Sequence, residues 1–224
     1  MSAAAALLDR LGRPGDVRLG TAHPPVIARL RTGLGPLDAV LGGGLPRGRI
    51  SELAGPRSAG RTGLACQAAA SATRARETIA WVDPEDALDP EAAAAAGVDL
   101  ARTLWVRPRQ AVDALRATEI LLRAGGFGLV VLDVDAGLGR AGAGVWPRLA
   151  HAAEQTRTAL LVVTPERRAG TFAALGMEVV ARRVRWSGGP GRLVLLDGID
   201  ARVVVARNRI GRPGQAVVVR QACA

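Results

Sequence analysis

The sequence predicts an α/β fold in which a mostly parallel, twisted sheet is flanked by helices and continued by antiparallel strands. Between residues 49 and 164, short apolar runs alternate with longer helical stretches, which is typical of crossover units around a parallel sheet. A glycine-rich turn follows the first of these runs. After Thr164, strand-like runs succeed one another without long helices, as they do in an antiparallel extension.

Each predicted element has the length that its type requires. The parallel strands are expected at residues 49–54, 78–83, 103–106, 128–133 and 159–164. The helices between them are expected at 62–75, 110–123 and 145–157. The antiparallel strands are expected at 179–186, 192–196, 202–207 and 215–219.

One core domain accounts for most of the chain. Its 224 residues suit a single well-buried unit, which we place at 26–224. Residues 1–25 form an N-terminal arm, with a short helix at 3–11 and a linker rich in Gly and Pro. No apolar run approaches the roughly 20 residues that span a bilayer, so we expect a cytoplasmic protein without a membrane partner. We expect Cys66 and Cys223 to be unpaired thiols, as in a reducing compartment.

The charge of the chain is concentrated in its C-terminal part. Every one of the 30 basic residues is arginine, and the net charge is +10. Residues 140–224 hold 14 Arg and 5 acidic residues, a balance of 14 − 5 = +9. This asymmetry favours contact with DNA, although a solvated basic face or an acidic protein partner would also account for it. The candidate DNA-binding residues are Arg167, Arg168, Arg182, Arg183 and Arg185, with Trp186 nearby to stack on a base.

The most informative motif is GPRSAGRT at residues 55–62. It follows a predicted strand, opens a predicted helix and matches G-x-x-x-x-G-K-[ST] except at Arg61. Its glycines let backbone N–H groups point inward, and the helix N-terminus adds partial positive charge. The pattern predicts a phosphate site; a purely structural turn is the alternative. The candidate cofactor-binding residues are Gly55, Pro56, Arg57, Ser58, Ala59, Gly60, Arg61, Thr62 and Asp133.

Arginine at position 61 argues against efficient phosphoryl transfer. Lysine acts in this place as a compact point charge, whereas guanidinium is wider, planar and forked. ATP and Mg²⁺ are the cofactors that the motif allows, with Thr62 and Asp133 as the metal-supporting residues. We expect ATP hydrolysis to be slow or absent.

The segment 32–62, TGLGPLDAVLGGGLPRGRISELAGPRSAGRT, resembles the entry of RecA-family recombinases into their ATP site. WVDPEDALDP at 81–90 resembles the family segment with the water-activating glutamate, which implies that role for Glu85, here as a vestige. GLVVLD, ending at Asp133, resembles the second nucleotide motif. VVVARNRIGRPG at 203–214 implies intersubunit roles for Arg207 and Arg209. The resemblance therefore implies a RecA-like core.

Three further departures from the family pattern argue against a full recombinase. The chain has no Tyr, and Ala92 stands where the family stacks a tyrosine on adenine. The stretches that correspond to the two DNA-binding loops are shortened, to about 135–144 and 165–175, and Asp135 is interpreted as a loop carboxylate. The nucleotide-sensing glutamine expected after the strand at 159–164 is missing.

Small RecA-like proteins of this design resemble the ImuA type of accessory protein. That resemblance implies a role in damage-induced translesion synthesis and mutagenesis, within the SOS response. The partners it implies are RecA, an inactive Y-family polymerase homologue of the ImuB type, an error-prone DNA polymerase and DNA.

Three hypotheses follow from these observations. The first is an adaptor that links RecA or DNA to a polymerase complex with little or no ATP turnover. The second is a DNA-dependent ATPase in which Arg61 replaces lysine. The third is an interaction module that binds neither nucleotide nor DNA.

Overall fold

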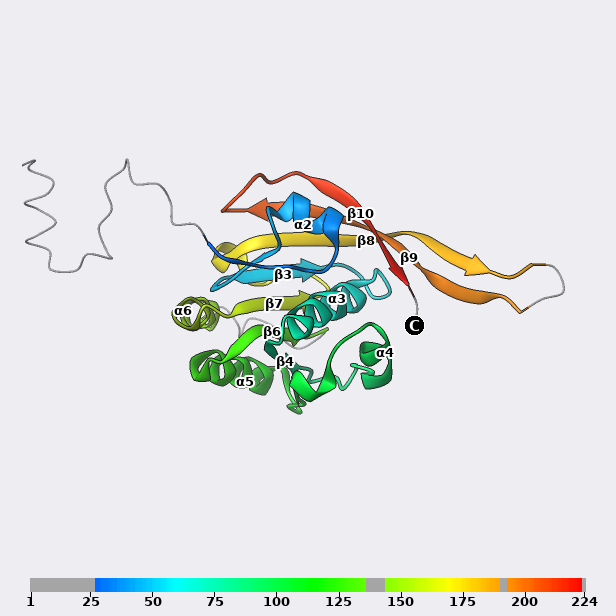
Figure 1. The fold of residues 1–224 in the computed structure, drawn as a ribbon. Coiled ribbons are helices and arrows are strands. Elements are labelled where there is room, and N and C mark those ends of the chain that lie inside the picture. The colour runs from blue at the N-terminus through cyan, green and yellow to red at the C-terminus, as the bar shows by residue number, and fades with distance from the viewer. Residues whose placement is uncertain (1–26, 136–143, 190–192, 223–224) are drawn as a thin grey trace, which may run out of the picture.

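The computed structural model describes residues 27–135, 144–189 and 193–222. An eight-stranded sheet with the order β10-β9-β8-β3-β7-β6-β4-β5 forms its centre (Figure 1). The predicted arm at 1–25 and Cys223 lie outside the described residues. Cys66 is buried and forms no disulfide with a described residue.

The parallel part of the sheet agrees with the sequence prediction to within one residue at each boundary. Its strands are β3 (Ile50–Ala54), β4 (Thr78–Val82), β5 (Thr103–Val106), β6 (Phe127–Asp133) and β7 (Ala159–Thr164). The helices are α3 (Arg61–Arg74), α5 (Ala111–Ala124) and α6 (Trp146–Thr156). The predicted α/β class is therefore confirmed.

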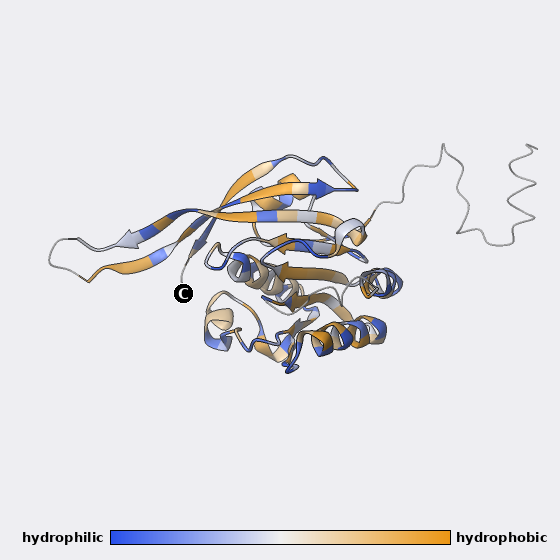
Figure 2. Cartoon of the chain, turned by 180° about the vertical axis from the view of Figure 1, so that it is seen from behind, coloured by the Kyte–Doolittle hydropathy of each residue, from blue (hydrophilic) through white to orange (hydrophobic). Residues whose placement is uncertain are grey.

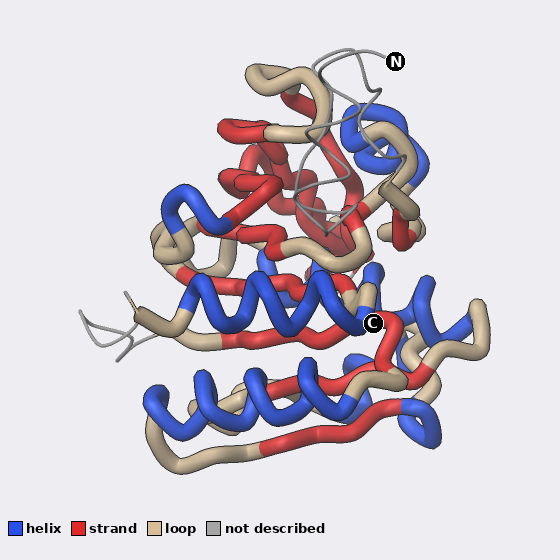
Figure 3. Tube along the Cα trace, turned by 90° about the vertical axis from the view of Figure 1, so that its left-hand side faces the viewer, coloured by secondary structure: helices blue, strands red, loops and turns tan. Residues whose placement is uncertain are grey.

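Helices cover both faces of this parallel part. On one face α3 contributes Ala65, Ala68 and Ala69 to a buried cluster with β3, β4, β6 and β7, and these small side chains let the helix lie close to the sheet. On the other face α5 and α6 pack side by side (Figure 3) and bury Leu122 and Leu149 against the strands. Two buried faces explain why the central strands are almost continuously apolar.

The antiparallel part differs from the prediction in its strand lengths. It consists of β8 (Ala173–Ser187), β9 (Leu195–Asn208) and β10 (Ala216–Ala222), and β8 also pairs in parallel with β3. The prediction of separate strands at 192–196 and 202–207 was wrong, because residues 195–196 and 202–207 belong to one strand, β9. Asp197 and Gly198 interrupt the apolar pattern, but they are accommodated by a register shift: Gly198 faces Arg185, whereas Leu196 faces Trp186.

The outer ends of β8 and β9 extend beyond the rest of the sheet as a projecting hairpin (Figures 1 and 2). We call residues 182–189 and 193–199 the projecting hairpin. Nearer the centre, Val179 and Val203 are buried, whereas Trp186 at the outer end is 61% exposed. Exposed leucines near the tip add to this apolar surface.

Several short elements were not predicted. They are β1 (Arg29–Leu30), α2 (Gly35–Leu41), β2 (Leu45–Pro46), α4 (Pro90–Ala95) and the short 3-10 helices η1 (Leu100–Arg102) and η2 (Gly170–Phe172). In α2, Leu37 and Leu41 pack into the same cluster as α3. None of the helices in the described ranges has both the length and the apolar run that a bilayer crossing requires.

Candidate functional site

The glycine-rich loop at 55–60 joins β3 to α3 at the carboxyl edge of the parallel strands. Gly60 has φ 94 and forms the N-cap of α3, and Ser58 has φ 61. These left-handed conformations curl the loop around the N-terminus of α3, a geometry that is typical of phosphate sites. Gly55 has a second role: a Cβ there would collide with the carbonyl oxygen of Val179 in β8. Packing against β8 therefore requires a glycine at position 55, in addition to the requirement of the loop.

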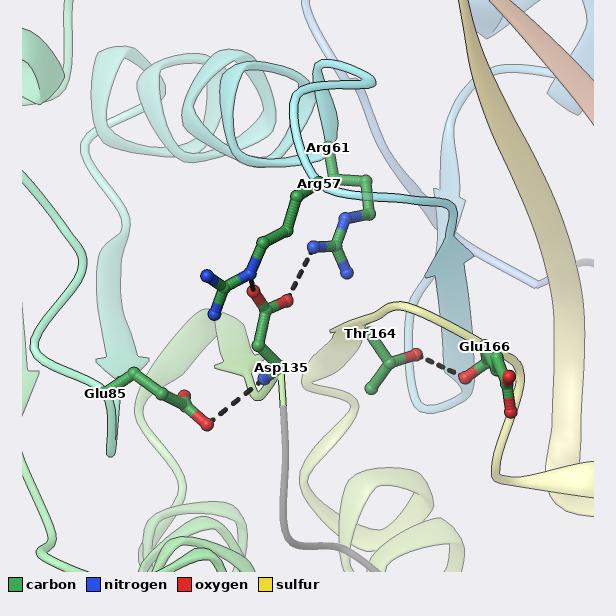
Figure 4. Close-up of polar contacts among 6 residues, drawn as sticks. All are labelled: Arg57, Arg61, Glu85, Asp135, Thr164 and Glu166. Atoms are coloured by element: carbon green, nitrogen blue, oxygen red, sulfur yellow. Dashed lines mark hydrogen bonds and ion pairs between the residues drawn. The ribbon is translucent and has the colours of Figure 1, made fainter.

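Both arginines of the loop bind one carboxylate. The Nη2 of Arg61 donates to Oδ1 of Asp135 at 2.5 Å, and the Nε of Arg57 donates to Oδ2 at 2.7 Å (Figure 4). Arg61 is only 7% exposed, whereas the Arg57 side chain is 79% exposed. Partial burial alone would raise the pKa of Asp135, but the hydrogen bonds from Arg61 and Arg57 outweigh burial and hold that pKa below its usual range.

Two further carboxylates, those of Asp133 and Asp83, lie close to Asp135 and Arg61. Burial, followed by the charge of Asp83, raises the pKa of Asp133 to about 7, although Arg61 acts in the opposite direction. Asp83 is itself buried and accepts hydrogen bonds from the N–H groups of Ala87 and Leu88. Asp83 therefore holds the turn after β4 in place.

The carboxylate of Glu85 lies beside the same cluster. Its Oε1 accepts a hydrogen bond from the backbone N–H of Asp135 at 3.2 Å (Figure 4). The structure thus brings Glu85 to the segment that follows β6, close to Asp133. A general base that takes a proton from water would have to lie in this region, at the edge of the sheet.

The residues present fit a phosphate group better than they fit ATP with Mg²⁺. The curled loop and the start of α3 provide the usual donors, but the charge of Arg61 is already neutralised by Asp135. The pKa of Asp133 lies at about 7, so binding of Mg²⁺ to this carboxyl group at neutral pH would be coupled to release of its proton. In the described ranges, no three His, Cys, Asp or Glu side chains are arranged to hold a metal ion.

The C-terminal strand closes one side of the loop. In β10 the side chain of Gln221 lies directly against Gly60 and Gly63, because a Cβ on either glycine would collide with its amide. A pocket of about 330 Å³ remains between the loop and this strand. Its lining includes Arg57, Ser58, Gly60, Arg61, Thr62, Gly63, Asp135, Ile199, Gln221 and Ala222.

The segment after β7 is held by a buried glutamate. Glu52 in β3 is 1% exposed, and its Oε1 accepts hydrogen bonds from the backbone N–H groups of Arg168 and Ala169 at 2.5 and 2.6 Å. The hydroxyl of Thr164 donates to the carbonyl of Glu166 at 2.8 Å (Figure 4). These contacts order the turn at the place where the resemblance led us to expect a sensor glutamine.

The predicted DNA-binding arginines fall into two groups. Arg182 and Arg183 on the projecting hairpin are exposed and make no ion pair with any described residue. Arg185 lies beside Asp200 at 3.3 Å and is partly buried. Arg167 and Arg168, near η2, pair with Glu178 and Glu166 at 3.3 and 3.4 Å.

The two predicted intersubunit arginines bind within the chain. The Nη1 atoms of Arg207 and Arg209 donate to the carbonyls of Gly170 and Thr171, each at 2.7 Å. Both bonds are exposed to solvent. They attach the end of β9 to η2. Ala92 is exposed on α4, where its N–H is bound by Asp89.

Sequence reasoning found the loop but missed Asp135 and Gln221, which contact it, and Glu52, which holds the segment after β7. Asp135 was interpreted as a loop carboxylate, although its place two residues after Asp133 is a signal for proximity to the loop. Glu52 has a signal too, as a charged residue inside an apolar strand. For Gln221 the sequence offers none, because its contact depends on how β10 returns to the loop.

Comparison with known proteins places these observations in a family. Residues 2–143 match the model of the RecA N-terminal domain. A RecA protein of Clavibacter michiganensis subsp. michiganensis is 32% identical over 95% of this chain and 68% of its own length. A RecA protein of Kineococcus radiotolerans is 41% identical, but the match covers 62% of this chain and 40% of that protein.

A solved structure supports the fold. The crystal structure of the RadB recombinase superposes with a TM-score of 0.66 and covers 85% of this chain and 95% of its own. Its sequence identity is 21%, so the likeness concerns the fold alone.

Proposed function

The chain belongs to the RecA family, and from this premise we propose that it is a DNA-repair accessory protein with little or no ATP turnover. In this proposal the chain links RecA or DNA to an error-prone polymerase complex during damage-induced translesion synthesis. The polymerase complex would include an inactive Y-family homologue of the ImuB type, as the resemblance to ImuA-type proteins implies. A role in SOS mutagenesis follows from the same resemblance.

The observation that carries the proposal is the pairing of Arg61 with Asp135. In a phosphate loop the basic side chain must be available to the phosphates. Here it is 93% buried, because its exposed fraction is 7%, and it is bound to a carboxylate at 2.5 Å. ATP would have to displace Asp135 before Arg61 could stabilise charge on a transferring phosphoryl group. The site therefore favours a binding role over hydrolysis.

DNA binding is the second part of the proposal. Arg182 and Arg183 are exposed on the projecting hairpin beside Trp186, which is 61% exposed. Unpaired arginines neutralise backbone phosphates, and an exposed indole stacks on bases irrespective of sequence. We expect binding to single strands without sequence preference.

A DNA-dependent ATPase is the competing function, and Glu85 is the observation that favours it. Its carboxylate lies beside Asp135 and Asp133, where a general base for water would be needed. In that case Arg61 would have to leave Asp135 during turnover.

An ATP turnover assay with single-stranded DNA separates the two functions. We expect hydrolysis far slower than about 1 per second, a usual scale for competent enzymes. We expect Glu85→Gln to leave the residual rate unchanged. Hydrolysis near that scale, abolished by Glu85→Gln, would establish the ATPase and contradict the accessory role without turnover.

The cellular part of the proposal needs a genetic test. Deletion of the gene in its host should lower the frequency of damage-induced mutation, and the wild-type gene should restore it. Restoration by Glu85→Gln is expected, because the proposed role does not use hydrolysis. An unchanged mutation frequency in the deletion strain would contradict the role in mutagenesis.

A further inference from the structure

One edge of β8 is open along the projecting hairpin (Figure 1). In the eight-stranded sheet β8 lies between β3 and β9, but β3 pairs with it only from Ala173 to Glu178. Its pairing with β9 continues to Ser187. Among the described residues, no strand pairs with the other edge of β8 between residues 180 and 187, which we call the open edge. Its backbone groups form a template onto which a further strand can add.

The register of the hairpin places its apolar side chains together on one face. Val184 pairs with Ile199 in β9. Two residues further along β8, Trp186 pairs with Leu196. Paired residues of antiparallel strands share a face, and so do residues two apart in one strand. We call these four side chains the apolar face. The exposed fractions are 44% for Val184, 61% for Trp186 and 40% for Leu196, so the described chain leaves this face largely uncovered.

Arginine occupies the opposite face of the hairpin. Arg183 and Arg185 alternate with the apolar residues of β8, so they point to the other face. Arg183 pairs in register with Asp200, and Arg202 lies two residues from Asp200 along β9, so Arg202 shares this basic face. Asp200 lies beside Arg185 at 3.3 Å, which leaves Arg183 and Arg202 exposed without an acidic partner among the described residues. The open edge therefore runs between an apolar face and a basic face.

A strand added at the open edge would present its side chains alternately to these two faces. Side chains on one side of such a strand would extend the apolar face, and those on the other side would lie beside the arginines. Opposite charges on neighbouring strands stabilise a sheet, whereas like charges that face each other destabilise it. The strand that matches the open edge therefore alternates apolar and acidic residues.

A second copy of the chain does not match this edge. Its net charge is +10, and pairing of two open edges would bring the arginines of one hairpin beside those of the other. The register shift between Ala181 and Arg183 also distorts the edge. Bulges and exposed basic residues are features that keep strand edges from pairing with themselves. An acidic strand, in contrast, is attracted by the same arginines.

We infer that the open edge of β8 is a docking site for an extended acidic segment of a partner protein, which adds as a strand and covers the apolar face. Trp186 is the main apolar contact of this segment, and Arg183 is its main charged contact. The site shares both residues with the proposed DNA surface, so DNA and the segment exclude each other. The inference does not depend on DNA binding, mutagenesis or ATP turnover, and it fails separately from them.

A fluorescently labelled peptide of about eight residues, in which valine and glutamate alternate, is the probe. Fluorescence anisotropy with the full chain should show saturable binding. A peptide with lysine in place of glutamate should not bind, because its charge is like that of the arginines. N-methylation of the peptide backbone along one edge removes hydrogen-bond donors and should also abolish binding. No saturation with the valine–glutamate peptide up to about 1 mM protein would overturn the inference.

Two variants test the assigned contacts. Trp186→Ser removes the largest apolar contact and should weaken binding of the valine–glutamate peptide about tenfold. Arg183→Glu should weaken it by a similar factor and should gain affinity for the valine–lysine peptide. Both side chains are exposed, so the melting temperatures of the variants should equal that of the wild type. Unchanged affinity of both variants for the peptide would overturn the site.

Matched controls come from elsewhere on the surface. Leu104 is 45% exposed in β5, at the opposite end of the strand order, and Arg116 is exposed on α5. Neither Leu104→Ser nor Arg116→Glu should change the dissociation constant of the peptide. Weaker binding in Leu104→Ser but not in Trp186→Ser would move the segment to β5 and overturn the assignment. Equal effects of Arg183→Glu and Arg116→Glu would reduce the contribution of Arg183 to net charge and overturn its role.

Amide hydrogen exchange locates the added strand. Bound peptide should slow the exchange of alternate amides in residues 180–187, because only alternate residues direct their N–H groups to the open edge. The amides of β5 should exchange at an unchanged rate. Binding of the peptide without protection in residues 180–187 would overturn strand addition.

Nucleic acid and a second copy are the competing occupants of the apolar face. Loss of single-stranded DNA binding in Trp186→Ser, together with no binding of the peptide to the wild type, would assign this face to DNA. A dimer that is detected by analytical ultracentrifugation and lost in Trp186→Ser would assign it to a second copy. Either result would overturn the inference.

Discussion

Arginine side chains are paired with a carboxylate at the loop end of the sheet, whereas two of those on the projecting hairpin are unpaired. At the loop end, Arg61 and Arg57 bind Asp135, and Glu52 binds two backbone N–H groups. On the hairpin, Arg182 and Arg183 lie exposed without an acidic partner among the described residues.

The difference teaches that charge alone does not identify a binding surface in this protein. A paired, buried charge contributes to the folded state and leaves little for a ligand to gain. An exposed, unpaired arginine contributes little to folding and remains available to a polyanion. Substitutions of the buried charged groups at the loop end should therefore change stability, and substitutions on the hairpin should change DNA binding.

The largest effect is expected for Glu52→Ala. This change leaves the buried N–H group of Ala169 and the part-buried N–H group of Arg168 without an acceptor, and the buried group alone costs about 1–3 kcal/mol. The free energy of unfolding, measured by urea denaturation, should fall by at least that amount. Glu154→Ala is the control, because the Glu154 side chain is 58% exposed in its pair with Arg49. Similar losses of unfolding free energy in Glu52→Ala and Glu154→Ala would contradict the distinction between buried and exposed carboxylates.

The next effect is a pH dependence that comes from Asp133. Its pKa rises from 3.8 to about 7 on folding, so the folded state binds more protons than the unfolded state in that window. The contribution of this group to stability is therefore full below pH 3.8, falls as the pH rises through 7 and stays lost above it.

Asp133→Asn should abolish the loss of stability that occurs as the pH rises, because asparagine does not titrate. Urea denaturation at pH 8 should show the variant to be more stable than the wild type by an amount on the order of 2 kcal/mol. The difference should shrink as the pH is lowered toward 5. A difference independent of pH would mean that Asp133 does not titrate in this window.

A smaller effect is expected when the hairpin loses its charge. Replacement of Arg182 and Arg183 by Gln should reduce the salt slope of single-stranded DNA binding by about 1.4, since each phosphate contact contributes roughly 0.7. Fluorescence anisotropy between 50 and 200 mM salt would measure the slope. The unfolding free energy should stay unchanged, and the double substitution of Arg167 and Arg168 is the comparison. A slope that falls only in this second variant would move the DNA surface to the region of η2.

The smallest effect is expected for Arg57→Gln. The Arg57 side chain is 79% exposed, and its ion pair with Asp135 is screened by solvent, so the change in unfolding free energy should be below about 1 kcal/mol. Salt-dependent DNA binding should not change, because the charge of Arg57 is paired inside the chain. A strong loss of DNA affinity in Arg57→Gln would place DNA at the glycine-rich loop. It would contradict the distinction between paired arginines at the loop and unpaired arginines on the projecting hairpin.

The sequence by itself determined the parallel half of the molecule. Periodicity and length are local properties, so β5 and β7 appear at their predicted bounds and α3, α5 and α6 within one residue of them. The loop at 55–62 was recognisable because its glycines and its place between strand and helix are also local. The α/β class and the antiparallel extension followed from the same reasoning.

Tertiary structure alone decided what the loop contacts. Asp135 reaches Arg61 across 74 positions of the chain, and Gln221 reaches Gly60 from the last described strand. The continuity of β9 through Gly198 is decided in the same way, since the register shift depends on pairing with β8. Such contacts depend on the order of strands in the sheet, and no pattern along the chain states which distant carboxylate or amide will meet the loop. The composition shows that the protein is rich in arginine. Only the fold determines which arginines are paired and which are exposed, because pairing depends on neighbours in space.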